Sequence, residues 1–160
     1  MMGLTRNLLA LQKQVDVQTN VEIPSAALTL TRSATLAITT AGTTITWQTE
    51  TRSQGFTWSG TDITIPTSGY YVINFAYSAF PTVHTSTVFM RINGVNVTYM
   101  AASNVPSATA HAFTAVRYMV TNDVLSIRVI PSVNCTVIVI AEASNGESPI
   151  LHITQLTGVI

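Results

Sequence analysis

The sequence predicts an all-β domain preceded by a short helix. Val, Ile and Thr together make up 57 of the 160 residues, and these β-branched side chains favour strands because they lose rotamer freedom in helices. From residue 27 onward, short apolar runs alternate with turn signals rich in Gly, Pro and Asn, which is typical of a β-sandwich or barrel. We therefore divide the chain into an N-terminal helix and arm over residues 1–26 and one β domain over residues 27–160.

The N-terminal segment carries an apolar seam with the spacing of a coiled-coil helix. Its members are Leu4, Leu8, Leu11 and Val15. Pro24 prevents the helix from continuing, and a helix of about two heptads is too short to be stable alone in water. The seam must therefore pack against something: its own domain, a parallel bundle with sister chains, or a different protein to which it tethers the domain.

The β domain is expected to contain short strands separated by turns. They are predicted over residues 27–31, 35–39, 43–49, 62–65, 70–79, 87–92, 95–100, 110–120, 124–130, 136–141 and 150–156. Asn93-Gly94 between two of these runs is a strong signal for a two-residue hairpin. The segment over residues 49–55 is expected to be rich in turns.

The longest predicted strand is apolar on both faces. One face carries Tyr71, Ile73, Phe75 and Tyr77, and the other carries Tyr70, Val72, Asn74 and Ala76. A strand that is apolar on both sides is covered on both sides. We expect the opposite sheet to cover one face and a neighbouring subunit to cover the other.

Several segments resemble the C1q/TNF-like jelly-roll superfamily. Residues 61–75 are similar to its signature of a short strand, a proline and Gly-x-Tyr-x-Phe-x-Phe, with Ile73 in place of the first Phe. Residues 88–95 resemble its central hairpin, and residues 116–127 resemble its strand–turn–strand element with Asn-Asp in the turn. Residues 150–156 look like the closing strand without its usual aromatic residues.

This resemblance implies a ten-strand jelly-roll sandwich that forms a homotrimer around a threefold axis, with the long strand near the axis. The expected trimer interface is Tyr71, Ile73, Phe75 and Tyr77. Members of the superfamily are mostly binding and structural modules rather than enzymes. The Thr- and Val-rich, cysteine-poor form without collagen repeats resembles those found on bacteriophage particles.

The sequence thus leads to a functional expectation and one alternative. We expect a non-enzymatic homotrimeric virion protein that decorates or cements a capsid, with a major capsid protein or another virion protein as its partner. The alternative is a fibre-tip or head-fibre module that binds a host surface glycan or receptor. Either protein would reside in the virion and be assembled in the host cytoplasm, in agreement with an N-terminal apolar run too short for a signal peptide.

The composition argues against other classes of protein. Only 9% of the residues are charged, and seven basic residues without a cluster do not suit the binding of nucleic-acid phosphates. No apolar stretch is long enough to span a membrane as a helix. We also expect a chain with so little charge and a net charge of zero to hide much of its surface in an assembly.

No residue pattern indicates catalysis, a metal site or a cofactor. His84, His111 and His152 each stand alone, without a ligand or carboxylate at a useful spacing. Cys135 is the only cysteine and is expected to be a small buried side chain. The carboxylates do not pair as a general acid and base would, and no nucleophile elbow or phosphate-binding glycine loop occurs.

One aromatic segment is a possible contact loop. It comprises Trp47, Arg52, Phe56 and Trp58. The aromatic rings either fill one end of the sandwich or are exposed, where they could bind a sugar or another protein.

Overall fold

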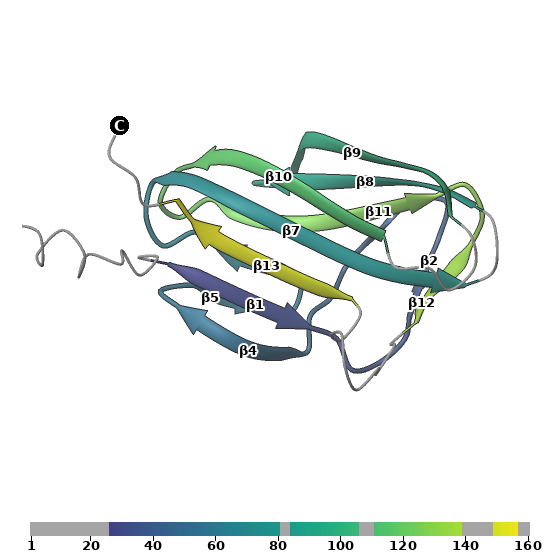
Figure 1. Cartoon of the computed structure of the whole chain (residues 1–160), viewed down its shortest axis with the longest axis horizontal. Coiled ribbons are helices and arrows are strands. Elements are labelled where there is room, and N and C mark those ends of the chain that lie inside the picture. The colour runs from purple at the N-terminus through teal and green to yellow at the C-terminus, as the bar shows by residue number, and fades with distance from the viewer. Residues whose placement is uncertain (1–25, 81–83, 106–110, 139–148, 157–160) are drawn as a thin grey trace, which may run out of the picture.

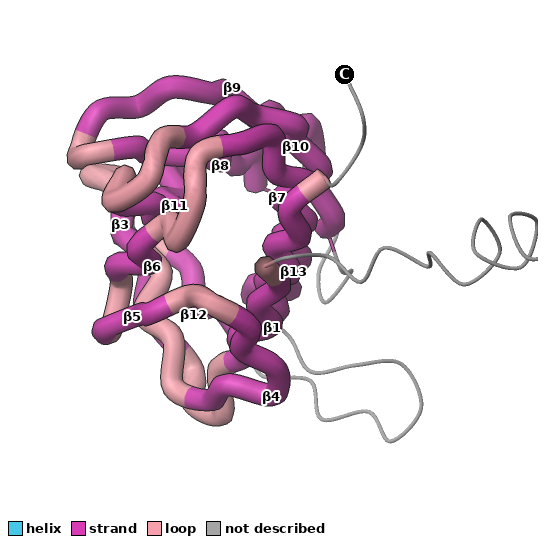
Figure 2. The backbone as a smooth tube through the Cα atoms, turned by 90° about the vertical axis from the view of Figure 1, so that its left-hand side faces the viewer, coloured by secondary structure: helices cyan, strands magenta, loops and turns pink. Residues whose placement is uncertain are grey.

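The computed structural model describes residues 26–80, 84–105, 111–138 and 149–156. Within these ranges the chain forms thirteen strands and no helix, arranged as two facing sheets (Figures 1 and 2). This confirms the all-β prediction. The predicted helix with Leu4, Leu8, Leu11 and Val15 lies outside the described residues.

The first sheet contains β7 at its centre. Its strands are β1 (Ala27–Thr31), β2 (Leu36–Ile38), β4 (Thr49–Gln54), β7 (Gly69–Phe80), β10 (His111–Met119), β12 (Cys135–Ile138) and β13 (Ile150–Gln155). Antiparallel pairs join β4 to β1, β1 to β13, β13 to β7 and β7 to β10. Most of β7 therefore lies between β13 and β10.

The second sheet covers one side of the first. Its strands are β3 (Thr43–Thr44), β5 (Thr57–Ser59), β6 (Asp62–Thr64), β8 (His84–Ile92), β9 (Val95–Val105) and β11 (Val124–Pro131). Asn93 and Gly94 connect β8 to β9 with φ angles of 51° and 79°, as a two-residue hairpin of type I′ requires. The predicted hairpin is confirmed.

The structure corrects the expected trimer interface. Tyr71, Ile73, Phe75 and Tyr77 are at most 1% exposed in the single chain and point between the two sheets. Phe75 meets Trp47 edge-on at 6.2 Å between ring centroids, and Tyr71 meets Phe56 at 5.9 Å. These four side chains therefore form the core and cannot contact a sister subunit. The large rings fill the space between the sheets, which leaves the other face of β7 available.

The strand pattern differs from the prediction around residues 43–59. β4 occupies the segment expected to be rich in turns, whereas the strand expected over residues 43–49 shrinks to the two residues of β3. All six residues of β4 are exposed, and the strand pairs with β1 at the end of the sheet order. An edge strand that buries no side chain carries no apolar alternation from which it could be predicted.

Candidate subunit interface

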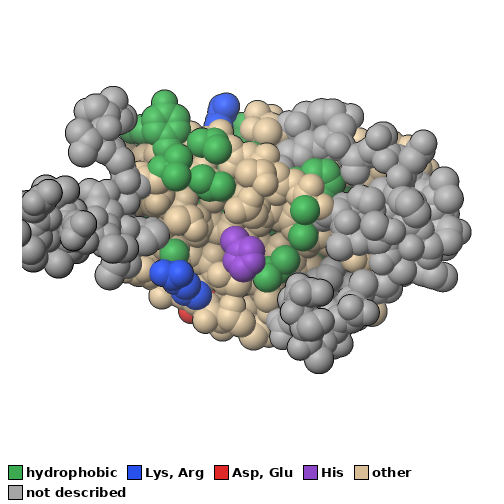
Figure 3. Space-filling model, in the orientation of Figure 1, with side chains coloured by type: hydrophobic (Ala, Val, Ile, Leu, Met, Phe, Trp, Pro, Cys, Tyr) green, Lys and Arg blue, Asp and Glu red, His purple; other side chains and the backbone are tan. Residues whose placement is uncertain are grey.

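The face of the first sheet that points away from the second sheet is the best candidate for a functional surface. We call it the outer face, and define it by the side chains of β7, β10 and β13 that alternate with the core residues. They are Tyr70, Val72, Asn74, Ala76, Ala112, Thr114, Val116, Tyr118, Ile150, His152 and Thr154. Strands β10, β7 and β13 lie side by side toward the viewer in Figure 1, and Figure 3 shows the same side as a surface.

A line of polar side chains crosses the middle of this face. The strand register aligns Thr114, Asn74, His152, Thr29 and Arg52, on β10, β7, β13, β1 and β4. We call these five residues the polar row. The Thr114 hydroxyl donates to Asn74 Oδ1 at 2.7 Å, and Thr29 Oγ1 lies 3.0 Å from His152 Nδ1. These side-chain hydrogen bonds hold part of the row in a fixed arrangement.

Smaller apolar side chains flank the polar row on both sides. Val116 pairs with Val72 on one side, and Ala112 pairs with Ala76 on the other, next to Ile150. Val116 is 58% exposed, although it stands within a sheet rather than in a loop. No described part of the chain therefore covers this side chain.

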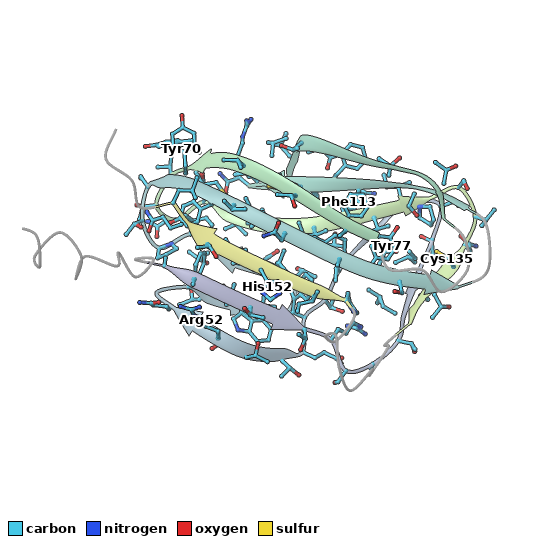
Figure 4. The ribbon with its side chains drawn as sticks, in the orientation of Figure 1. Arg52, Tyr70, Tyr77, Phe113, Cys135 and His152 are labelled. Carbon is cyan, nitrogen blue, oxygen red and sulfur yellow. The ribbon has the colours of Figure 1, made fainter. Side chains whose placement is uncertain are left out.

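Two tyrosines extend the apolar surface at one end of the face. Tyr70 and Tyr118 contact each other edge-on at 5.2 Å between ring centroids, and they are 47% and 51% exposed. Tyr70 lies at the upper left of Figure 4, where Figure 3 shows a group of hydrophobic side chains. Large rings exposed beside apolar neighbours are typical of protein–protein contacts.

The outer face carries almost no charge. None of its eleven side chains is Asp, Glu, Lys or Arg. His152 is at the centre, and Arg52 lies at the far end of the polar row, toward the lower left of Figure 4. Such a surface suits a partner surface that is equally uncharged.

The fold places the four residues of the possible contact loop in different environments. Trp47 and Phe56 are 3% and 6% exposed and belong to the core, so they cannot bind a partner. Trp58 is half-buried, and its indole N–H donates to Glu50 Oε2 at 2.6 Å. Arg52 is exposed on β4. The aromatic residues thus mainly fill one end of the sandwich, which was the first of the two interpretations.

The described residues show little sign of a metal site, a membrane-spanning helix or a reactive thiol. No three His, Cys, Asp or Glu side chains there gather as a metal site would require, and no helix there is long and apolar enough to cross a membrane. Cys135 is buried, and burial raises the pKa of its thiol to about 11. The side chains of His84 and His111 lie outside the description.

The sequence shows both faces of the long strand to be apolar, but the predicted trimer interface, Tyr71, Ile73, Phe75 and Tyr77, lies on the inner face. Tyr70, Val72, Asn74 and Ala76 form the other face of that strand in the predicted alternation. Their cross-strand neighbours Val116, Tyr118 and His152 were not singled out as interface residues, because the register of three strands is needed to bring them together.

Comparisons with known proteins define the class of fold. No family model matches the sequence, and a comparison with curated protein sequences finds no match. Solved structures do match. One of murine APRIL has a TM-score of 0.58 at 13% identity, covering 82% of this chain and 98% of the other.

Two further matches come from other animals. The Eiger TNF of S. frugiperda has a TM-score of 0.58 at 10% identity, covering 86% of this chain and 96% of its own. The globular domain of zebrafish complement 1qA has a TM-score of 0.54 at 11% identity, covering 82% and 98%. The fold is therefore a jelly roll of the TNF and C1q type, as the sequence resemblance implied.

Proposed function

We propose that the protein is a non-enzymatic structural module that assembles as a homotrimer through the outer face. The observation that carries this proposal is an exposed, uncharged and partly aromatic sheet surface. Contiguous apolar surface that stays exposed on a folded chain marks a site of association. Because soluble homo-oligomers mostly adopt closed symmetry, each copy would offer the same surface around one axis.

A second copy of this chain is the partner that fits the surface best. The face lacks charge, and so does much of the chain, in which 9% of residues are charged and the net charge is zero. Two such surfaces bury each other without leaving an unpaired ion in the contact. The resemblance to the C1q/TNF-like superfamily implies three copies, with the long strand β7 near the axis.

The oligomeric state tests this proposal. Light scattering on the full chain is expected to give about three times the 17.2 kDa of one chain. Val116→Asp places a carboxylate in the proposed contact and should return the protein to the monomer mass, because a buried unpaired charge is costly. A monomer mass for the unaltered chain at every concentration would show that the proposal is wrong.

Val95→Asp is the matched control. Val95 is 64% exposed and begins β9 in the second sheet, directly after the hairpin turn. This variant should keep the trimer mass, and circular dichroism should show that both variants are folded. Equal dissociation of the two variants would mean that added charge alone, rather than its position on the outer face, separates the chains.

We further propose that the trimer decorates a virus capsid. The support is the resemblance of this Thr- and Val-rich chain, which lacks collagen repeats, to modules on bacteriophage particles. The segment over residues 1–26 would serve as the tether. Three tethers on one trimer would bind a repeating shell multivalently, so that weak single contacts add up to stable attachment.

Genomic context and sedimentation test the capsid proposal. The gene is expected to lie beside one for a major capsid protein, and the co-expressed chain should sediment with the assembled shells. Deletion of residues 1–25 should abolish this association. Undiminished sedimentation of the deleted form would overturn the tether. If the chain instead bound host cells, and Arg52→Ala with Trp58→Ala abolished that binding, receptor binding would replace decoration.

A further inference from the structure

His152 occupies the centre of the proposed interface. It lies in the middle of β13, between β7 and β1, and its side chain is exposed on the outer face (Figure 4). Its Nδ1 is 3.0 Å from the Thr29 hydroxyl, which donates to this nitrogen when the imidazole is neutral with its proton on Nε2. The neutral ring therefore already has a partner for its acceptor nitrogen.

Among the described residues, the strand positions that neighbour His152 offer no group to neutralise a positive charge. The neighbouring strands present Asn74 from β7 and Thr29 from β1, and β13 itself presents Ile150 and Thr154. None of these is a carboxylate. Beyond them, the polar row ends in Thr114 on β10 and in Arg52 on β4. Arg52 is two strands away, about 10 Å, and has the same sign as an imidazolium.

We propose that His152 makes the trimer pH-dependent, so that the subunits associate at neutral pH and separate near pH 5. This inference rests on the homotrimer proposed above. Imidazole is the side chain that ordinarily changes charge between pH 5 and 8. In a trimer, the outer face is covered, and symmetry brings three copies of His152 into equivalent positions in the interface.

The direction of the pH effect depends on whether the charged imidazolium is less favourable in the trimer or in the separated chains. Burial and like-charged neighbours both disfavour the imidazolium, so the assembled chains bind fewer protons than the separated chains. The trimerisation constant therefore rises with pH. Association is favoured at neutral pH and is lost in acid, where histidine side chains ordinarily become charged.

The size of the effect is set by the number of protons. With one proton taken up by each of three chains on dissociation, the trimerisation constant falls by up to about a thousandfold per pH unit. A change of this size is readily measured by sedimentation at fixed protein concentration. The fold itself need not change, because His152 lies on the surface of the single chain.

Sedimentation of the full chain at about pH 8 and about pH 5 tests the inference, with circular dichroism to confirm that the chain stays folded. The unaltered protein should be a trimer at the higher pH and a monomer at the lower. His152→Gln keeps a polar group beside Thr29 but cannot become charged, so it should remain a trimer at both. His152→Lys carries a permanent charge and should be a monomer at both.

Matched controls assign the effect to one histidine. His84→Gln and His111→Gln should respond to pH as the unaltered protein does. The inference is overturned if His152→Gln dissociates at about pH 5 as the unaltered chain does, or if His152→Lys assembles normally at about pH 8. A chain that is monomeric at about pH 8 overturns the homotrimer itself, which distinguishes the two failures.

Discussion

At the scale of single residues, two weak acids lie buried close to each other. Tyr77 on β7 is fully buried, and Cys135 at the start of β12 is 5% exposed. Burial raises the pKa of Tyr77 to about 12, an effect partly opposed by a hydrogen bond with Ser86 and increased by the nearby Cys135. Burial also raises the pKa of the Cys135 thiol to about 11. Both groups therefore keep their protons up to a higher pH in the folded chain than in the unfolded chain.

This difference predicts a loss of stability in alkali. The unfolded chain releases these two protons near the ordinary values of 9.0 and 10.0, and the folded chain releases them only near 11 and 12. The stabilisation is therefore present below about pH 9 and is lost as the pH rises through the higher values. We expect the free energy of unfolding to fall by roughly 3–4 kcal/mol between pH 8 and pH 11. Urea titrations measure this fall, and Cys135→Ala should remove part of it. Equal slopes in the two proteins would contradict the assignment to Cys135.

At the scale of elements, a strand was predictable where apolar and polar residues alternate along it, and it was not predictable where this alternation is absent. The sequence predicted β1 at its observed bounds and β7 to within one residue at each end. It assigned the trimer interface to the face of β7 that turns inward, because both faces are apolar and the sequence does not decide between them. That choice depends on the packing of Phe75 against Trp47 and of Tyr71 against Phe56, which are partners far away in sequence. Similarly, β4 is a strand because it pairs with β1, and no local sequence signal predicts it.

The hairpin between β8 and β9 gives a prediction at this scale. The Asn93 side chain donates to Asp123 Oδ1 at 2.8 Å and accepts from the Val124 N–H at 2.9 Å, so it ties the hairpin to the start of β11. Asn93→Gly keeps the positive φ but loses these bonds, and should cost about 1 kcal/mol of unfolding free energy. Asn93→Ala also strains the backbone and should cost about 2 kcal/mol. Chemical denaturation measures both. Asn96→Ala, at an exposed position near the start of β9, is the control, and equal costs for Gly and Ala would contradict the role of φ.

At the scale of the whole molecule, the candidate interface is a property of the topology. His152, Asn74 and Thr114 are far apart in sequence, and only the register of β13, β7 and β10 sets them in one row. Composition could predict that a chain with 9% charged residues would hide surface. It could not locate that surface, because apolar side chains occur on both faces of the longest strand. In the fold, the face of this strand with the larger aromatic side chains is buried between the sheets, so the opposite face is the exposed one.

Association should also be visible in the thermal stability of the whole molecule. If folded chains are held in a trimer and unfolded chains are not, then dilution favours unfolding by mass action. For a chain of 160 residues, a tenfold dilution should lower Tm by about 2–4 °C. Differential scanning calorimetry over a hundredfold range of concentration measures the shift. Val116→Asp, which we expect to be a folded monomer, should melt at a Tm that is independent of concentration. A concentration-independent Tm in the unaltered protein would mean that the trimer contributes nothing to folding stability, and that the outer face is stable while exposed to water.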